Sequence, residues 1–235
     1  MQSINLLYRK EYEINDKIHI VIPTVGEVIE HEDAYFGLVS ILTAVPFDMM
    51  VQLDDIGIDF TSINEWELFL LLFTGLKSQD TSLIFGDLDL SKFQLATNEQ
   101  NGQIVLLDSE NDIVIDRAIH GQIAAAIRKI HHMEKNRHKP GNDDAKKYLL
   151  ERAREKQKRN KKRSVPSQLE SLIVALVNTE QYKYDFERTR ELSIYQFNES
   201  VRQIIKKIDY DHRMYGVFSG TIDVKGLRKE DLTWL

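Results

Sequence analysis

A basic stretch in the second half of the chain limits what this sequence can fold into. Eight of the twelve residues from Arg152 to Arg163 are Lys or Arg, and Ala153 is the one apolar residue among them. Such a segment cannot lie in a protein core, because burying unpaired charges costs far more free energy than a helix recovers. We therefore expect the apolar residues before and after this stretch to pack as separate modules, with the far end of the basic stretch exposed to solvent.

Charge is also distributed unevenly over the rest of the chain. Residues 1–116 contain 5 Lys/Arg and 21 Asp/Glu, residues 117–165 contain 16 and 5, and residues 166–235 contain 10 and 11. Two interpretations follow. In the first, the acidic part binds the basic middle, within one chain or between subunits. In the second, the basic segment neutralises an external polyanion such as nucleic acid. The first interpretation requires no ligand.

The first part of the chain predicts an acidic α+β module over residues 1–138. Alternating apolar residues on both sides of Asn15-Asp16 predict an opening β-hairpin. Thr24 is a candidate helix cap, and a second helix is expected from Glu32 until Pro46 ends it. Asn64 followed by Glu67 is the pattern of a capping box, so a third helix is expected from there to about Leu76. This third helix is apolar around its whole circumference, which predicts burial on several sides.

A small antiparallel sheet is expected next, because the period of the apolar pattern changes towards two after residue 80. An amphipathic helix should then begin at Arg117 and pack on that sheet, with Arg128, His131 and His132 on the side away from its apolar stripe. The expected strands are Ser82–Phe85, Phe93–Ala96, Gln103–Leu107 and Asp112–Ile115.

The second half of the chain predicts a basic connector over residues 139–165 and a helical module over residues 166–235, which makes the fold class α+β. Within the helical module, apolar residues recur at helical spacing in two runs. These two helices are expected to form an antiparallel pair, and the second should bury one seam. The first run is Leu169, Leu172, Ile173, Leu176 and Val177, and the seam of the second is Ile194, Phe197, Val201, Ile204 and Ile208.

Motifs for catalysis, cofactors or metals are absent from the sequence. There is no cysteine, no Gly-rich phosphate or dinucleotide loop and no Ser nucleophile elbow. His120 and His131 share a predicted helix face but would lie about 16 Å apart, too far for one metal ion. The sequence therefore predicts no catalytic residue, no cofactor and no metal ligand, and we expect no enzyme activity. A hydrolase built on an acidic cluster is a third alternative, its candidate residues being Asp54, Asp55, Asp59, Asp87 and Asp89.

Membrane insertion is not expected. The longest apolar run, Leu68 to Phe73, has six residues, whereas roughly 18 are needed to cross a bilayer. The first residues also lack the basic and apolar regions of a signal peptide. We expect a protein that works in the cytoplasm.

Four stretches of the sequence resemble a known family in their order and layout. They are EVIEHEDAYFGLVSILTAVPFDMM, EWELFLLLF, YDFERTRELSIYQFNESVRQIIKKIDYDHRMYGVFSGTID and the closing DLTWL. Together they are similar to the larger tail assembly chaperones of phages and prophages of Gram-positive bacteria. The resemblance implies a non-enzymatic protein that forms homo-oligomers and binds the tape-measure protein before the tail tube polymerises around it. It would act in the host cytoplasm or remain in the virion.

Candidate partner-binding residues lie in two places. One group belongs to the basic connector, and the other lies near the end of the chain. If the connector binds nucleic acid, the chain is a nucleic-acid-binding phage protein, but the basic stretch has no aromatic residue for base stacking. The candidates are Lys158, Arg159, Lys161, Lys162 and Arg163 in the connector, and Tyr215, Phe218 and Trp234 near the end.

Overall fold

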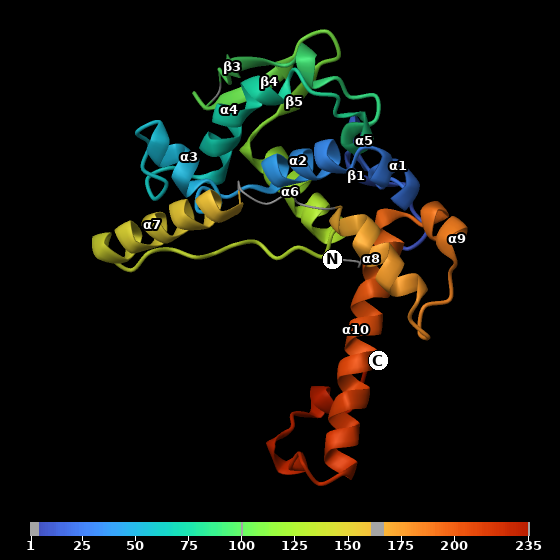
Figure 1. Ribbon diagram of the computed structural model, residues 1–235. Coiled ribbons are helices and arrows are strands. Elements are labelled where there is room, and N and C mark those ends of the chain that lie inside the picture. The colour runs from blue at the N-terminus through green and yellow to red at the C-terminus, as the bar shows by residue number, and fades with distance from the viewer. Residues whose placement is uncertain (1–4, 100, 161–166, 235) are drawn as a thin grey trace.

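The computed structural model describes residues 5–99, 101–160 and 167–234 and confirms the α+β fold class (Figure 1). It contains two small antiparallel sheets, one of two strands and one of three in the order β3-β4-β5. The strands are β1 (Glu11–Asn15), β2 (Ile18–Val21), β3 (Gln94–Thr97), β4 (Ile104–Asp108) and β5 (Ile113–Ile115).

The opening hairpin forms where the sequence predicts it. Glu11 pairs with Val21 and Tyr12 pairs with Ile20 in an antiparallel register. The side-chain oxygen of Asn15 accepts hydrogen bonds from the backbone N–H groups of residues 17 and 18, which closes the turn. Ile18 and Ile20 are fully buried, so one face of the hairpin belongs to the core.

Within the described residues, six α-helices and one 3-10 helix, η1 (Leu90–Lys92), follow the hairpin up to residue 130, and the predicted caps are present. Thr24 and Asn64 each form a capping box with the Glu three positions later, at the start of α1 and α4. Asp116 caps α6, which contacts the hairpin, β5 and α2. The bounds are α1 (Val25–Glu30), α2 (Glu32–Thr43), α3 (Met50–Asp55), α4 (Glu65–Leu76), α5 (Ser82–Phe85) and α6 (Arg117–Ile130).

The expected strand at Ser82–Phe85 is wrong, because these residues form the short helix α5. The Asp80 carboxylate accepts a hydrogen bond from the Ser82 N–H, and the Thr81 carbonyl accepts from the N–H groups of Ile84 and Phe85. Gly86, with φ +59°, then reverses the chain. An apolar run of four residues is too short for its periodicity to separate a strand from a helical turn.

Helix α4 is apolar all round because it lies between two buried clusters. Trp66, Phe69 and Phe73 belong to the main core, whereas Leu68 packs into a smaller cluster with residues of α3. The expected burial on several sides is thus confirmed for these two sides. Leu71 is the exception, with 48% of its surface exposed.

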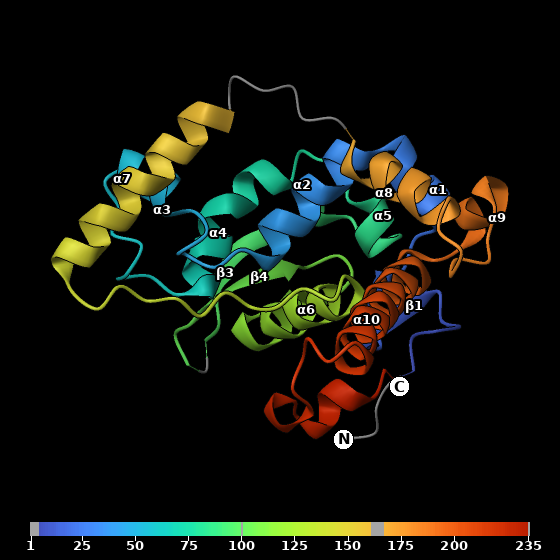
Figure 2. The ribbon, with the colours of Figure 1, turned by 60° about the horizontal axis from the view of Figure 1, so that its bottom comes forward.

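The second half of the chain contains four α-helices within the described residues. An irregular linker, residues 133–142, leads to the basic helix α7 (Figure 2). Two short 3-10 helices, η2 (Val224–Gly226) and η3 (Lys229–Leu232), follow the last α-helix. The α-helices are α7 (Asp143–Asn160), α8 (Gln168–Val177), α9 (Phe186–Glu191) and α10 (Ile194–Phe218).

The expected antiparallel pairing of α8 with α10 is wrong. The connection between them folds into α9, which contacts α8 and α1. Ile194 donates its backbone N–H to the Pro23 carbonyl, which fixes the start of α10 against the first module. From there α10 projects away from the rest of the molecule (Figure 1). Core residues of α8 and α10 belong to the same buried cluster as those of the first module. The module boundaries expected at residues 138 and 166 therefore stay a prediction.

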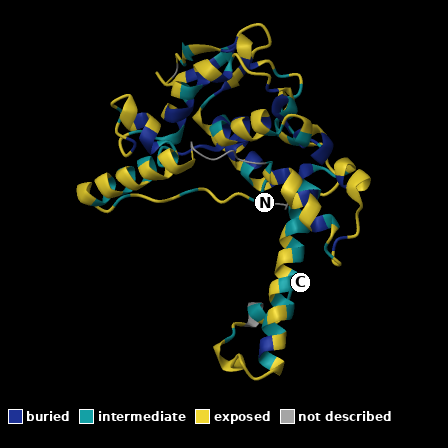
Figure 3. Ribbon diagram, in the orientation of Figure 1, coloured by how far each residue is buried: buried dark blue, intermediate teal, exposed yellow. Residues whose placement is uncertain are grey.

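The predicted seam of α10 is buried only near its start. Ile194 and Phe197 are buried, with exposed fractions of 1% and 0%. Val201 and Ile204 are partly buried against the core, Ile208 is also partly buried, and the neighbouring Ile205 is 55% exposed. Figure 3 shows the change along the helix, whose projecting part is largely intermediate or exposed. The expectation fails there because α10 leaves the main core after its first turns, so its later seam residues lack the packing that Ile194 and Phe197 have.

None of the helices within the described residues is long and apolar enough to cross a membrane.

Candidate protein-binding surfaces

The basic helix α7 is held by acidic residues of the first module. Arg154 Nη2 lies 2.6 Å from carboxylate oxygens of both Asp54 and Asp55, at the end of α3. Lys146 Nζ lies 2.5 Å from Asp59 and 5.6 Å from the centre of the Phe60 ring. The acidic module and the basic connector therefore bind each other within one chain, as the first interpretation of the charge distribution requires.

A narrow apolar contact supports these ion pairs. Leu149, Leu150 and Ala153 pack against the smaller cluster, while Tyr148 is 61% exposed. No residue of α7 is fully buried. Helix α7 thus lies on the surface of α3 through one apolar strip and a few charged contacts.

The acidic cluster that the sequence offered as a metal or acid-base site has another role. Hydrogen bonds from Lys146 and from Thr61 lower the pKa of Asp59 to about 2, so this carboxylate stays ionised. Asp54 and Asp55 share Arg154. In the described part of the chain, no group of three or more His, Asp or Glu residues could hold a metal ion. Asp54, Asp55 and Asp59 form the surface that binds α7, whereas Asp89 lies elsewhere and accepts a hydrogen bond from the Ser91 N–H, and Asp87 lies beside it.

The end of α7 is not matched in this way. Lys158 and Arg159 are exposed, and neither forms an ion pair with any described residue. Lys161, Lys162 and Arg163, the other predicted binding residues of the connector, lie outside the described residues. The cationic end of α7 is therefore available to a partner.

The projecting part of α10 carries a stripe that is exposed at its far end, at Tyr215 and Phe218. Ile204, Ile208, Asp211, Tyr215 and Phe218 follow one another at spacings of 4, 3, 4 and 3 residues, which places them on one side of the helix. This stripe, called the α10 stripe below, continues the side that buries Phe197 at the core.

The residues after α10 fold back on a different side of the helix. Arg213 donates to the Asp231 carbonyl at 3.0 Å, and the Ile222 side chain lies against Gly216, where a Cβ would approach it to 2.6 Å. With 3.6 residues per turn, positions 213 and 216 lie about 180° and about 120° from Ile204 around the helix. These two contacts lie away from Ile204, and Tyr215 and Phe218 at the far end of the stripe stay exposed.

The three predicted aromatic binding residues fall in two environments. Tyr215 is 77% exposed and Phe218 is 87% exposed, both on the α10 stripe. Trp234 is partly buried, and the Lys207 ammonium lies 5.7 Å from the centre of its ring. The structure thus brings Tyr215 and Phe218 together, whereas Trp234 packs beside Lys207.

Two histidines of α6 and its C-terminal cap lie in the interior. His120 stacks on Phe69 with ring centroids 4.2 Å apart, and His131 Nε2 lies 2.9 Å from the Tyr35 hydroxyl. Burial lowers the pKa of each to about 4. The expectation that His131 points away from the packed side of this helix is wrong, because α2 covers that position. Both histidines are neutral structural residues near pH 7.

The C-terminal part of the chain has one match among known protein families. Residues 156–235 match the YomV second domain. This family is of phage origin, from a Bacillus prophage. The matched segment begins within α7 and includes α8, α9 and the whole of α10. No curated protein and no solved structure matches the chain. The α10 stripe and the cationic end of α7 thus belong to a phage-associated segment.

Sequence reasoning missed one further surface, a pocket beside the linker that contains Phe47, Phe60, Arg137 and Lys139. These residues come from three separate segments, and no local pattern connects them.

Proposed function

We propose that this chain is a non-enzymatic phage tail morphogenesis protein, an assembly chaperone or a structural component. It binds a long helical partner, such as a tape-measure protein, through the α10 stripe. The observation that carries this proposal is the projection of α10, whose heptad-like stripe is buried at one end and uncovered at the other. The phage origin of the matched family supports the setting.

The stripe has the geometry of a helix-binding surface. Residues at alternating spacings of 3 and 4 form the seam along which two helices pack. Covering Tyr215 and Phe218 would stabilise a complex by about 1.5–3 kcal/mol for each fully buried side chain. Asp211 interrupts the stripe, but Lys207 of the same helix already pairs with it at 2.5 Å. The stripe also suits self-association, so we include a homo-oligomer in the proposal.

Co-expression tests this function. The chain is produced together with candidate tape-measure and tail-tube proteins, chosen from the genes around its own, and complexes are measured by size-exclusion chromatography with light scattering. We expect a stable complex that the Tyr215→Glu/Phe218→Glu variant loses, with an unchanged circular dichroism spectrum. The matched control is Tyr8→Glu/Tyr148→Glu, which alters two exposed aromatic residues elsewhere. A complex that survives the first variant, or the absence of any complex, would contradict the proposal.

Nucleic-acid binding is the second candidate function. It is favoured by one observation, the unpaired Lys158 and Arg159 at the exposed end of α7. Lys and Arg side chains that neutralise phosphates release counterions and give salt-dependent binding. Binding of random-sequence DNA by the wild type at about 0.15 M salt, lost when the cations of the connector are replaced by Gln, would separate this candidate from the first.

A further inference from the structure

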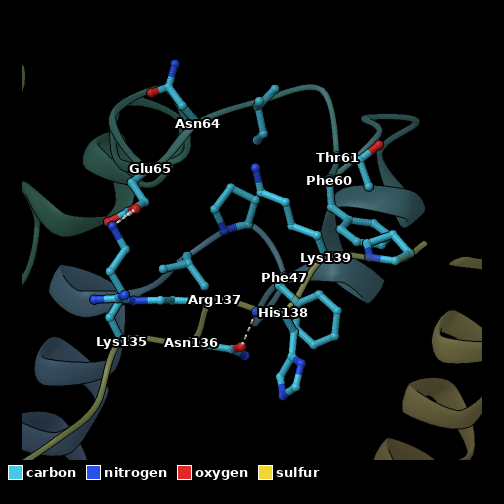
Figure 4. Close-up of a pocket in the computed structure, with 14 residues that line it drawn as sticks. Phe47, Phe60, Thr61, Asn64, Glu65, Lys135, Asn136, Arg137, His138 and Lys139 are labelled. Atoms are coloured by element: carbon cyan, nitrogen blue, oxygen red, sulfur yellow. Dashed lines mark hydrogen bonds and ion pairs between the residues drawn. The ribbon is translucent and has the colours of Figure 1, made fainter. Parts of the chain in front are cut away.

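A pocket of about 640 Å³ lies beside the linker, between the turn after α2 and the segment that precedes α4 (Figure 4). Its volume falls within the usual range for ligand sites. Phe47 and Phe60 form part of its wall, with ring centroids 6.0 Å apart and planes at 79°. Val45, Pro46 and Ile63 extend the apolar wall. We call this site the linker pocket.

The linker supplies the pocket with positive charge. Lys135 pairs with Glu65, the one carboxylate among the lining residues. Arg137 and Lys139 also line the pocket, yet neither forms an ion pair or a side-chain hydrogen bond with any described residue. In Figure 4 the Lys139 side chain extends across the middle of the view, and Arg137 lies next to Lys135. The pocket therefore combines an apolar wall with two cations that lack partners.

The linker backbone is unpaired as well. Residues 134–140 have no regular secondary structure, and none of their backbone N–H or C=O groups takes part in a backbone–backbone hydrogen bond with described residues. The one local bond is from the His138 N–H to the Asn136 side chain. An extended backbone with unused donors and acceptors can pair with an extended peptide, as exposed sheet edges do.

We propose that the linker pocket binds an extended acidic segment of a partner protein. One aromatic or large aliphatic side chain of that segment inserts against Phe47 and Phe60, and flanking carboxylates pair with Arg137 and Lys139. Arginine is well suited to carboxylates because its guanidinium donates two parallel hydrogen bonds. This inference does not depend on the proposed function, since it concerns a different surface of the molecule.

A nucleic acid fits the pocket less well than a peptide. Base stacking requires an open ring face. His138 lies 5.8 Å from Phe47, and the Lys146 ammonium lies over Phe60, so each ring already has a neighbour. The two rings also meet edge to face and present no flat platform. A side chain that packs against this apolar wall, with carboxylates beside it, is the better match.

The test uses fluorescein-labelled peptides and the full chain at about 0.15 M salt, where exposed charges are screened beyond about 8 Å. The probe has one phenylalanine between two runs of Asp and Glu, and binding is followed by fluorescence anisotropy. We expect saturable binding that Arg137→Glu/Lys139→Glu weakens at least tenfold. A peptide with Ala in place of phenylalanine should also bind at least tenfold more weakly. The matched control, Arg9→Glu/Lys10→Glu, carries the same charge change just before β1, on a surface with no binding role, and should bind like the wild type.

Four outcomes would overturn the proposal. The first is the absence of saturable binding up to millimolar peptide. The second is equal weakening by both charge-reversal variants, which would indicate unspecific attraction. The third is equal binding of the phenylalanine and Ala peptides, which would exclude an apolar anchor. The fourth is binding of an oligothymidine probe that Arg137→Glu/Lys139→Glu abolishes while the acidic peptide does not bind, which would assign the pocket to nucleic acid.

Discussion

Helices α7 and α10 are the two longest helices of the described chain, and they relate to the core in opposite ways. Helix α7 has no buried residue and is held along one side by Lys146 and Arg154. Helix α10 buries Ile194 and Phe197 at its start and then leaves the core. One is attached by charge over part of its length, and the other is attached by packing at one end.

This difference shows which of the two helices has its binding surface within the same chain. The acidic first module and the basic helix match each other within the molecule, so much of the charge asymmetry is used internally. The far end of the α10 stripe has no such match within the described chain. Its exposed aromatic residues do not gain the free energy that burial would provide. An uncovered, regularly spaced stripe therefore points to a partner more strongly than a basic run does.

The largest expected effect breaks the attachment of α10. Replacing Phe197 by Ala removes a fully buried ring and should lower the free energy of unfolding by about 3–5 kcal/mol. Replacing the exposed Ile205 by Ala should change it by less than about 0.5 kcal/mol. Urea denaturation followed by circular dichroism measures both. Similar losses for the two variants would mean that the far half of α10 is buried in solution, as an oligomer would cause.

The next effect is a loss of stability at low pH, which comes from two histidines packed near the core and not from the ion pairs of α7. Burial lowers the pKa of His120 and of His131 to about 4, below the unfolded value near 6.5. The unfolded chain then binds more protons between pH 6.5 and pH 4, so stability is complete above pH 6.5 and is lost as pH falls towards 4. From pH 7 to pH 5 we expect a loss of about 2 kcal/mol for each histidine. The Asp59 carboxylate, whose pKa is about 2, stays ionised over this range.

A conservative variant isolates one of these histidines. Replacing His120 by Phe keeps an aromatic ring beside Phe69 and removes the titrating group. Its free energy of unfolding should fall less between pH 7 and pH 5 than that of the wild type, by about 2 kcal/mol. Denaturation curves at the two pH values show this directly. An unchanged pH dependence would indicate that His120 is neutral in both states or ionised in both.

Local signals in the sequence predict the elements that begin with a strong cap or a regular turn. The turn at Asn15-Asp16 and the capping boxes at Thr24 and Asn64 lie within a few residues of the structure they determine. The short helix α5 and the inserted helix α9 were not predicted, because each has fewer residues than two helical turns need to show a period.

For contacts between distant segments, the sequence predicts the type of interaction but not the residues that form it. The charge distribution indicates that acidic and basic parts attract each other, yet nothing local selects Arg154 as the partner of Asp54 and Asp55. The linker pocket depends on residues around 47, 60 and 137, which only the folded chain brings together. The direction of α10 likewise depends on its attachment at Pro23, which periodicity does not describe.

A smaller effect concerns the attachment of α7. Replacing Arg154 by Gln removes the ion pairs to Asp54 and Asp55 and keeps a long side chain. Because exposed ion pairs contribute little to global stability, the midpoint of thermal unfolding should stay within error. Hydrogen exchange of the α7 amides should become faster, and raising the salt concentration should have the same effect on the wild type. Arg152→Gln, on the same helix and without an ion pair to a described residue, is the control and should leave exchange unchanged.

The smallest effect is expected at the far end of α7. If a protein is the partner of this chain, the wild type should not bind random-sequence DNA at about 0.15 M salt, where a Debye length near 8 Å screens exposed charges. A variant with Gln at positions 158, 159, 161, 162 and 163 should then behave like the wild type in an electrophoretic mobility shift. Tight binding by the wild type that this variant loses would instead favour the nucleic-acid candidate, because neutralised phosphates release about one counterion each. In that case the unmatched charge of α7, and not the stripe of α10, would be the functional surface of the molecule.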